Sequence, residues 1–179
     1  MRLFDAHNHL QDERFGGQQD ELIADCVAVG LSRMVVNGTC ESDWPAVAAL
    51  AKRHDCVLPS FGLHPWFVHE RSPEWLAKLG QQLDDCPAAV GEFGLDRWKP
   101  GLGYDGQEEV FTAQLCLAAE RDLPASIHCL KTWGRLHELL RDGPLPKRGF
   151  LLHSYGGPVE MVEPLARHVE ENFVRLFGG

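Results

Sequence analysis

Short apolar runs alternate with longer stretches of helical spacing along the chain. Six short runs have the length and composition of strands, and they lie at residues 2–6, 33–37, 56–61, 88–92, 125–128 and 149–153. Apolar residues with helical spacing follow each run, for example over residues 107–121. This alternation is typical of consecutive βα units and a parallel sheet. No repeat, low-complexity tract or linker divides the pattern, so we predict a single α/β domain over residues 1–179.

Polar side chains close these predicted strands. They are His7 and His9 at the first strand, then Asn37, His64, Glu92, His128 and His153. Counted from His7, the successive intervals are 30, 27, 28, 36 and 25 residues, which is one βα unit each. In a closed parallel barrel the carboxyl ends of all strands meet at one mouth, so we expect these side chains to face one pocket.

The chemistry of this set indicates a metal centre. Zinc, manganese and iron bind imidazole nitrogen and carboxylate oxygen, and the residues that offer such ligands are His7, His9, Glu92, His128 and His153. Five ligands exceed the three or four of one catalytic ion, and a carboxylate can bridge two ions. The set therefore predicts a two-metal site with Glu92 between the ions.

Purely structural roles for the same residues remain open. Glu92 could form a structural salt bridge, because an unpaired carboxylate in an apolar strand is costly. His128 and His153 each end an apolar strand and could be hydrogen-bonded core histidines. His64, in a GLHP turn, could either order its loop or contact a substrate.

Composition and charge limit the functions that fit. A net charge of −9 argues against a protein that binds phosphates through a basic groove alone, so a nucleic-acid substrate would require bound cations. The apolar stretches are too short for a membrane span, and the first residues lack an apolar signal segment, which favours a cytoplasmic location without membrane contact. Six cysteines at irregular intervals, without a CxxC, predict reduced and mostly buried thiols.

With DAHNHL, GLHPW, GEFGLD, IHC and LLHSYGG in this order and spacing, the chain resembles the TatD family of metal-dependent deoxyribonucleases, which are amidohydrolase-like TIM barrels. The resemblance implies a (βα)8 barrel with two divalent cations (Mg, Mn or Zn) that hydrolyses phosphodiester bonds in DNA. It also implies a role for each matching residue. His7 and His9 would bind the first ion, Glu92 would bridge, His128 and His153 would bind the second ion, and His64 would be a catalytic residue that faces the substrate.

The chain departs from the family pattern in two places. Many members carry arginine two residues after the fifth-strand histidine, where this chain has Leu130 followed by Lys131. The larger departure is that the family's seventh strand, which ends in a metal-binding and base-forming aspartate, and its eighth strand have no counterpart. Asp96, which we expect to lie beyond its strand end, is a poor substitute for that aspartate.

The last residues suggest where the missing segment belongs. VEENFVRLFGG, residues 169–179, resembles the family's C-terminal helix, which favours an internal loss near residues 167–168 over a simple truncation. About six of eight βα units then remain in a TIM-barrel-like fold, and they predict an open barrel whose unpaired sheet edges invite association.

Three functions compete. The first is hydrolysis of DNA or of a small phosphodiester, weakened by the missing aspartate. The second is metal-dependent deacylation or amide hydrolysis, because the same ions polarise a carbonyl. The third is a non-catalytic remnant that binds metal or nucleic acid. Aromatic residues that follow the strands could stack bases or could be lid and core residues: Trp66, Phe67, Trp98, Trp133 and Tyr155.

Overall fold

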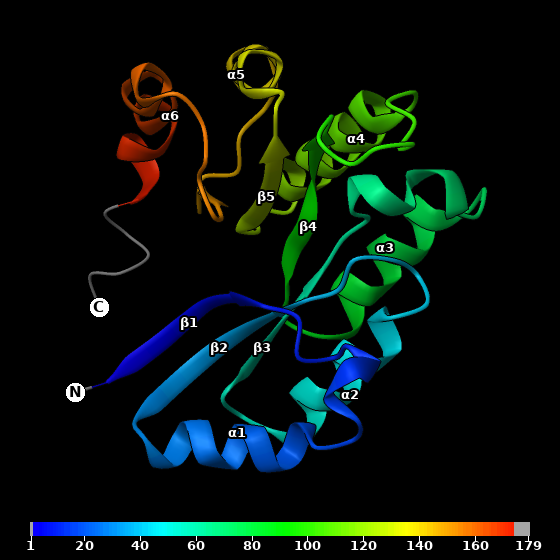
Figure 1. Cartoon of the computed structure of the whole chain (residues 1–179), viewed down its shortest axis with the longest axis vertical. Coiled ribbons are helices and arrows are strands. Elements are labelled where there is room, and N and C mark those ends of the chain that lie inside the picture. The colour runs from blue at the N-terminus through cyan, green and yellow to red at the C-terminus, as the bar shows by residue number, and fades with distance from the viewer. Residues whose placement is uncertain (1, 174–179) are drawn as a thin grey trace.

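The computed structural model describes residues 2–173, without the side chains of residues 168–173. Six parallel strands form one sheet, and their order in the sheet is their order along the chain. They are β1 (Leu3–Asn8), β2 (Leu31–Asn37), β3 (Val57–Phe61), β4 (Ala89–Asp96), β5 (Ala125–Leu130) and β6 (Phe150–Leu152). Figure 1 shows the sheet turning from β1 to β5 with the helices around its outside, which makes a curled half-barrel. The predicted α/β, TIM-barrel-like fold is confirmed.

Helices connect the strands, as the hydrophobic spacing predicts. They are α1 (Gln19–Ala28), α2 (Trp44–Arg53), α3 (Trp75–Asp85), α4 (Gln107–Glu120), α5 (Trp133–Asp142) and α6 (Val162–Phe173), with single-turn or short 3₁₀ segments at Glu13–Phe15, Pro65–Glu70 and Val159–Met161. Their apolar faces supply fully buried side chains such as Val47, Leu79 and Leu136. None of the helices described has the length and apolar composition that crossing a bilayer requires.

The sheet curls far enough to bring its first and last strands face to face. The His7 Nδ1 atom of β1 lies 2.9 Å from the Ser126 Oγ atom of β5, and the His7 ring stacks on that of His153, which follows β6, at 3.9 Å between centroids. Within residues 2–173, β1 pairs only with β2 and β6 only with β5. The barrel is therefore open between β1 and β6, as expected from six βα units.

Strand β4 is longer than the sequence predicted. The prediction ended this strand at Glu92 and placed Asp96 beyond it, but β4 runs to Asp96. Phe93 and Leu95 continue the apolar alternation, and both are completely buried. Their burial holds the strand against β5, and this carries Asp96 into the same inward-facing row as Glu92.

Strand β5 also continues past its expected end, to Leu130, so that His128 lies within it. The expectation that Glu92 and His128 close their strands was therefore wrong, although both strands were located. In β4 and β5 the polar residue marks the inner face of the strand and not its end.

The cysteines are only partly as expected. All six are free, but only Cys129 is fully buried, so the prediction of mostly buried thiols was wrong. Cys129 lies in a strand that is covered on both faces, whereas the other five lie on helices or in connections and are half-buried. The likeness of residues 169–179 to the family's terminal helix falls on side chains outside the described residues.

Gly94 allows β4 and β5 to approach each other. A Cβ atom at Gly94 would lie 1.8 Å from the backbone oxygen of His128, which cannot move without breaking the strand pairing.

We expect Gly94→Ala to lower the free energy of unfolding by about 3 kcal/mol, at the upper end of overpacking costs. The control is Gly134→Ala in α5, where nothing lies within 4 Å of the added atom. It should stabilise the chain by about 0.5 kcal/mol. Urea unfolding monitored by circular dichroism measures both, and equal effects of the two variants would contradict the packing argument.

Candidate metal centre

Glu92 lies at the middle of the candidate site. The Phe93 ring packs on Phe111 of α4 at 5.4 Å between centroids, so Phe93 faces the helices. Because successive side chains of a strand point to opposite faces, Glu92 points to the inside of the curl. Only 2% of Glu92 is exposed, and a carboxylate so deeply buried requires strong partners.

One oxygen of Glu92 meets the two histidines of the DAHNHL motif. The Oε2 atom lies 3.4 Å from His7 Nε2 and 3.0 Å from His9 Nε2, and the two nitrogen atoms are 3.3 Å apart. Ligand atoms at about 2.1 Å from a tetrahedral ion are about 3.4 Å apart, so this triangle is close to the size of one face of a zinc-type site. His7 ends the inward row of β1 and His9 comes just after the strand.

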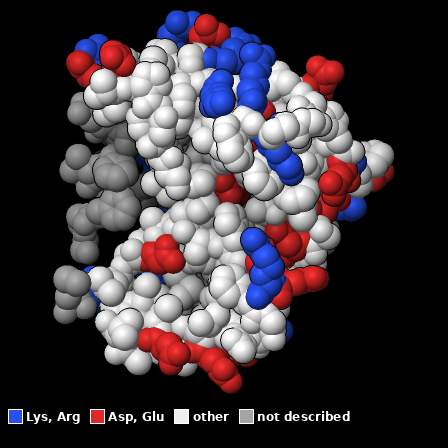
Figure 2. Space-filling model, viewed as in Figure 1, with Lys and Arg blue, Asp and Glu red and all other residues white. Residues whose placement is uncertain are grey.

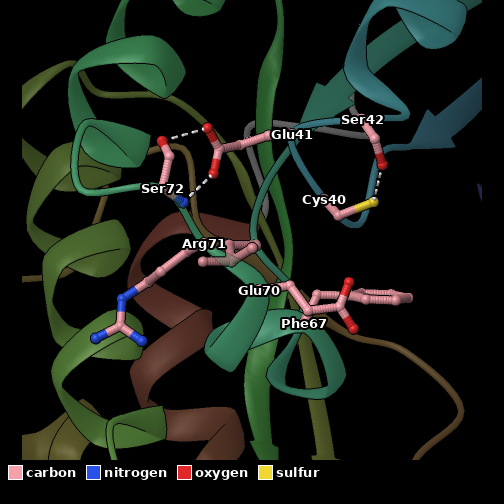
Figure 3. Close-up of a pocket in the computed structure, with 8 residues that line it drawn as sticks. Cys40, Glu41, Ser42, Phe67, Glu70, Arg71 and Ser72 are labelled. Carbon is pink, nitrogen blue, oxygen red and sulfur yellow. Dashed lines mark hydrogen bonds between the residues drawn. The ribbon is translucent and has the colours of Figure 1, made fainter.

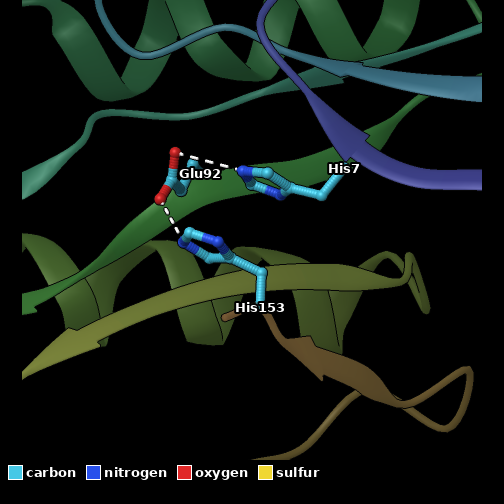
Figure 4. Close-up of side chains that lie close together, drawn as sticks. All are labelled: His7, Glu92 and His153. Carbon is cyan, nitrogen blue, oxygen red and sulfur yellow. Dashed lines mark ion pairs between the residues drawn. The ribbon is translucent and has the colours of Figure 1, made fainter. Parts of the chain in front are cut away.

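The other oxygen of Glu92 meets two histidines from the opposite side of the curl. Its Oε1 atom lies 3.2 Å from His128 Nδ1 and 2.5 Å from His153 Nε2. Figure 4 shows the carboxylate of Glu92 beside the stacked His7 and His153 rings, with a different oxygen toward each. The two oxygens thus serve two groups of imidazoles.

His64 also reaches this cluster, so the six predicted site residues lie together. Its Nε2 atom lies 3.6 Å from Glu92 Oε1. Two sets of three residues bring their ligand atoms within 4.8 Å of one another, namely His7 with Glu92 and His153, and His64 with Glu92 and His128. Distances alone therefore do not assign each histidine to one ion. The second ring nitrogen of each histidine, which faces away from Glu92 and is called the outer nitrogen below, gives further information through its hydrogen bonds.

Those outer nitrogen atoms have partners that hold the rings. His9 Nδ1 donates to the backbone oxygen of Asn37 at 2.8 Å, and His7 Nδ1 lies 2.9 Å from Ser126 Oγ. His128 Nε2 lies 3.1 Å from Asp96 Oδ2. Such outer partners orient metal-binding imidazoles and fix their tautomers. Asn37, whose side chain was expected to face the same pocket, contacts His9 through its main-chain oxygen, and its side-chain amide donates to the backbone oxygen of Val35.

Ser126 and Asp96 were missed as site residues in the sequence. Each lies an even number of positions from a recognised residue of its own strand: Ser126 is two residues from His128, and Asp96 is four residues from Glu92. The alternation of a strand places such residues on one face, and this signal could have found both.

The charge of Glu92 controls the cluster. Burial raises the pKa of Glu92, but hydrogen bonds from His128, His153, His64 and His7 outweigh burial and lower it strongly, so the carboxylate is ionised. Burial lowers the pKa of His9 and of His128, and the Glu92 carboxylate reverses the effect, so that both values are raised. The pKa values of His7 and His64 remain lowered, chiefly by burial.

A hollow of about 440 Å³ lies between the connections that follow β2 and β3. Its lining residues are Cys40, Glu41, Ser42, Leu63, Phe67, Glu70, Arg71 and Ser72. Figure 3 shows the Glu41 carboxylate turned toward Ser72, whose backbone N–H and hydroxyl both donate to it. Lys78 donates to the same carboxylate, so Glu41 has a structural role. The hollow contains none of the candidate ligands, but the Phe67 ring lies 6.3 Å from that of His64.

The aromatic residues that follow the strands fall into two groups. Trp133 is 8% exposed and packs on Tyr155 at 4.5 Å between centroids, so this pair belongs to the core and its rim. Trp98 is 54% exposed, and Lys99 Nζ lies 4.0 Å from the centre of the half-buried Trp66 ring. Only the second group, on the η2 segment Pro65–Glu70 and the connection after β4, leaves an aromatic ring open to a ligand.

An open α/β half-barrel with a cluster of histidines around one buried carboxylate is typical of metal-dependent hydrolases. Residues 4–178 match the family described as TatD related DNase, and the chain belongs to this family. It is 30% identical over 165 residues to the uncharacterized metal-dependent hydrolase YjjV of Escherichia coli, covering 90% of this chain and 63% of that protein. It is 32% identical over 171 residues to the 3′-5′ ssDNA/RNA exonuclease TatD of Enterobacter lignolyticus, covering 93% of this chain and 64% of that protein.

Solved structures agree on the fold. The crystal structure of the E. coli YjjV protein superposes with a TM-score of 0.86 at 28% identity, covering 93% of this chain and 65% of the other. A TatD family hydrolase from Entamoeba histolytica superposes with a TM-score of 0.81 at 20% identity, over 94% of this chain and 63% of the other, and supports the fold alone. The chain thus spans just under two thirds of the length of these relatives.

Proposed function

We propose that this chain is a hydrolase of phosphodiester bonds in single-stranded nucleic acid, with two divalent cations held by one bridging carboxylate. The observation that carries the proposal is the placement of Glu92, which turns one oxygen to His7 and His9 and the other to His128 and His153. A relative named as a 3′-5′ ssDNA/RNA exonuclease supports the choice of substrate and of the end that is attacked.

The residues fit two ions. The first would be held by His7 Nε2, His9 Nε2 and Glu92 Oε2, and the second by Glu92 Oε1, His128 Nδ1 and His153 Nε2. Imidazole and carboxylate ligands suit zinc or manganese, and magnesium fits less well because it prefers oxygen. When bound, a pair of such cations lowers the pKa of water and stabilises the charge of a phosphate in an in-line displacement.

His64 acts as a hydrogen-bond donor in this proposal and not as a ligand. Its Nδ1 atom accepts the backbone N–H of Trp66 at 3.1 Å, so the proton of the neutral ring lies on Nε2. Burial lowers the pKa of His64, which keeps the ring neutral at physiological pH. The Nε2–H group points into the cluster and can donate to a phosphate oxygen of the substrate.

The connection after β4 supports a substrate with phosphates and bases. Arg97 stacks on the Tyr104 ring at 3.9 Å, Lys99 stacks on Trp66, and Trp98 between them is exposed. On the face shown in Figure 2, several Lys and Arg side chains lie toward the top, where Figure 1 labels α4 and α5, with a few Asp and Glu side chains beside them. Cations beside open aromatic rings suit single-stranded nucleic acid.

The activity of the chain is expected to be weak. The family's seventh-strand aspartate would complete the shell of the first ion and accept a proton from the attacking water. We propose that a segment with this residue is absent near residues 167–168, so the first ion lacks one of its ligands, whereas the second keeps its full set of Glu92, His128 and His153. We therefore expect the second ion to bind more tightly than the first.

The experiment uses single-stranded DNA labelled at its 5′ end, incubated with the metal-free chain and with the chain supplied with Mn²⁺ or Zn²⁺. We expect slow shortening from the 3′ end that requires metal and is lost in His128→Ala, which excludes a contaminating nuclease. Bis(p-nitrophenyl) phosphate and an aminoacyl ester are compared in parallel. Cleavage of the ester alone would favour a deacylase, and metal binding without cleavage of any substrate would favour a binding protein.

A further inference from the structure

Two histidines face the same oxygen of Glu92 through different nitrogen atoms. His64 presents Nε2 and His128 presents Nδ1 to Glu92 Oε1, at 3.6 and 3.2 Å. A neutral imidazole carries a proton on one nitrogen and a lone pair on the other. Whether each ring faces the cluster as a donor or as a ligand therefore depends on what its second nitrogen contacts.

For His128 the second contact is a carboxylate. Its Nε2 atom lies 3.1 Å from Asp96 Oδ2, and a carboxylate can only accept, so Nε2 must carry the proton. In the metal-free chain Nδ1 also faces a carboxylate oxygen, Glu92 Oε1, and can carry a second proton. A cation bound at Glu92 Oε1 would displace that proton, and the lone pair of Nδ1 would then face the second ion. This is the opposite tautomer orientation to that of His64, whose second nitrogen accepts a backbone N–H.

Asp96 is itself held rigidly. It is completely buried, and its Oδ2 atom also accepts the indole N–H of Trp66 at 2.7 Å. Its Oδ1 atom accepts the backbone N–H groups of Trp98 and Lys99 at 2.7 and 3.1 Å. Four N–H donors thus converge on one side chain, and only a carboxylate can accept all four.

Trp66 joins the two histidines. Its backbone N–H donates to His64 Nδ1, and its indole N–H donates to the Asp96 oxygen that His128 contacts. Trp66 therefore fixes the tautomer of His64 directly and contacts the carboxylate that fixes the tautomer of His128. It also links the connection after β3 to the end of β4.

We infer that Asp96 is a positioning residue that fixes the tautomer of His128 and so makes Nδ1 of that ring a ligand of the second ion. The inference rests on the proposed function, because it assumes that the cluster binds metal. Carboxylates that hold a metal-binding histidine contribute about 10- to 100-fold to metal affinity. We expect a loss of that size, confined to the second ion, when Asp96 is replaced.

The test is Asp96→Asn in the full chain, because an asparagine must turn its NH₂ group either at the indole and His128 or at the two backbone N–H groups. Zn²⁺ is titrated into metal-free protein and followed by calorimetry. We expect one of two binding steps to weaken about 10- to 100-fold while the other stays within about twofold. The matched control is Asp12→Asn, since Asp12 also accepts the backbone N–H two residues on but lies outside the cluster.

A second measurement does not require the Asp96→Asn variant to fold. Long-range ¹H–¹⁵N NMR of the Zn²⁺-loaded wild-type chain reports the tautomer of each histidine ring, with the His128 signals assigned from His128→Gln. We expect His128 to carry its proton on Nε2, and Trp66→Phe, which keeps the backbone N–H but removes the indole donor, to leave that tautomer unchanged. A proton on Nδ1 of His128 would overturn the inference.

The outcomes separate this inference from the proposed function. A wild-type chain that binds no Zn²⁺ contradicts the proposed function. A wild-type chain that binds two ions, with an Asp96→Asn variant that binds both equally well, contradicts only the role of Asp96. Equal weakening of both steps in a natively folded variant would assign Asp96 a general structural role and would also overturn the inference.

Discussion

Replacing Glu92 with glutamine is expected to lower the content of both metal ions together. Each oxygen of Glu92 faces a separate group of imidazoles, so the carboxylate is common to both proposed sites. Glutamine keeps one oxygen without its charge and turns an NH₂ group, which has no lone pair to offer, toward the other site. The side chain is 2% exposed, so water cannot easily take the place of the lost ligand.

Elemental analysis of the purified protein after dialysis against equal free metal measures the effect. The matched control is Glu41→Gln, because Glu41 is held by Ser72 and Lys78 and lies outside the cluster, so this variant should retain its metal. A Glu92→Gln chain that keeps one ion fully and loses the other would show that the carboxylate does not bridge.

Completing the barrel is expected to raise the rate of metal-dependent hydrolysis by about 10²- to 10⁴-fold, the usual contribution of a general base. The described sheet ends at β1 and β6, each paired on one side, and the relatives are longer than this chain by about a third of their length. A segment of about 70 residues, roughly two βα units of a barrel of about 250, would fill the gap between those strands. It would also supply the base-forming aspartate next to His7 and His9.

The segment is taken from a family member and inserted between Arg167 and His168, where we propose that it is missing. Turnover of labelled single-stranded DNA is compared with that of the unmodified chain and of an insertion whose seventh-strand aspartate is replaced by asparagine. We expect the first insertion to be active and the second to gain little. Full activity in the unmodified 179-residue chain would contradict the role given to that aspartate.

The fold could be predicted because each buried strand is an apolar run that a helical stretch follows. The site could be predicted because parallel strands bring distant residues to one place, and the regular intervals from His7 to His153 already carried that information. The family and the curled half-barrel were both confirmed. The ligand roles of the individual histidines stay predictions that the variants above test.

What the sequence did not indicate depended on contacts between side chains. The prediction ended the strand that holds Glu92 at that residue, because a charged side chain is typical of a strand end. Asp96 was therefore placed outside the site. Its true neighbours, Trp66 and His128, are 30 and 32 residues away in the chain, and no local pattern reports them. The tautomers of His64 and His128 follow from such contacts and could not be predicted from residue types.

The claim at the centre of this account is that Glu92 holds two cations, one on each carboxylate oxygen. Anomalous diffraction at the zinc absorption edge from crystals of the Zn²⁺-loaded chain tests it directly. The account predicts two peaks, one between Glu92 Oε2 and the His7 and His9 rings, and one between Glu92 Oε1 and the His128 and His153 rings. A single peak, or peaks that do not contact Glu92, would contradict it.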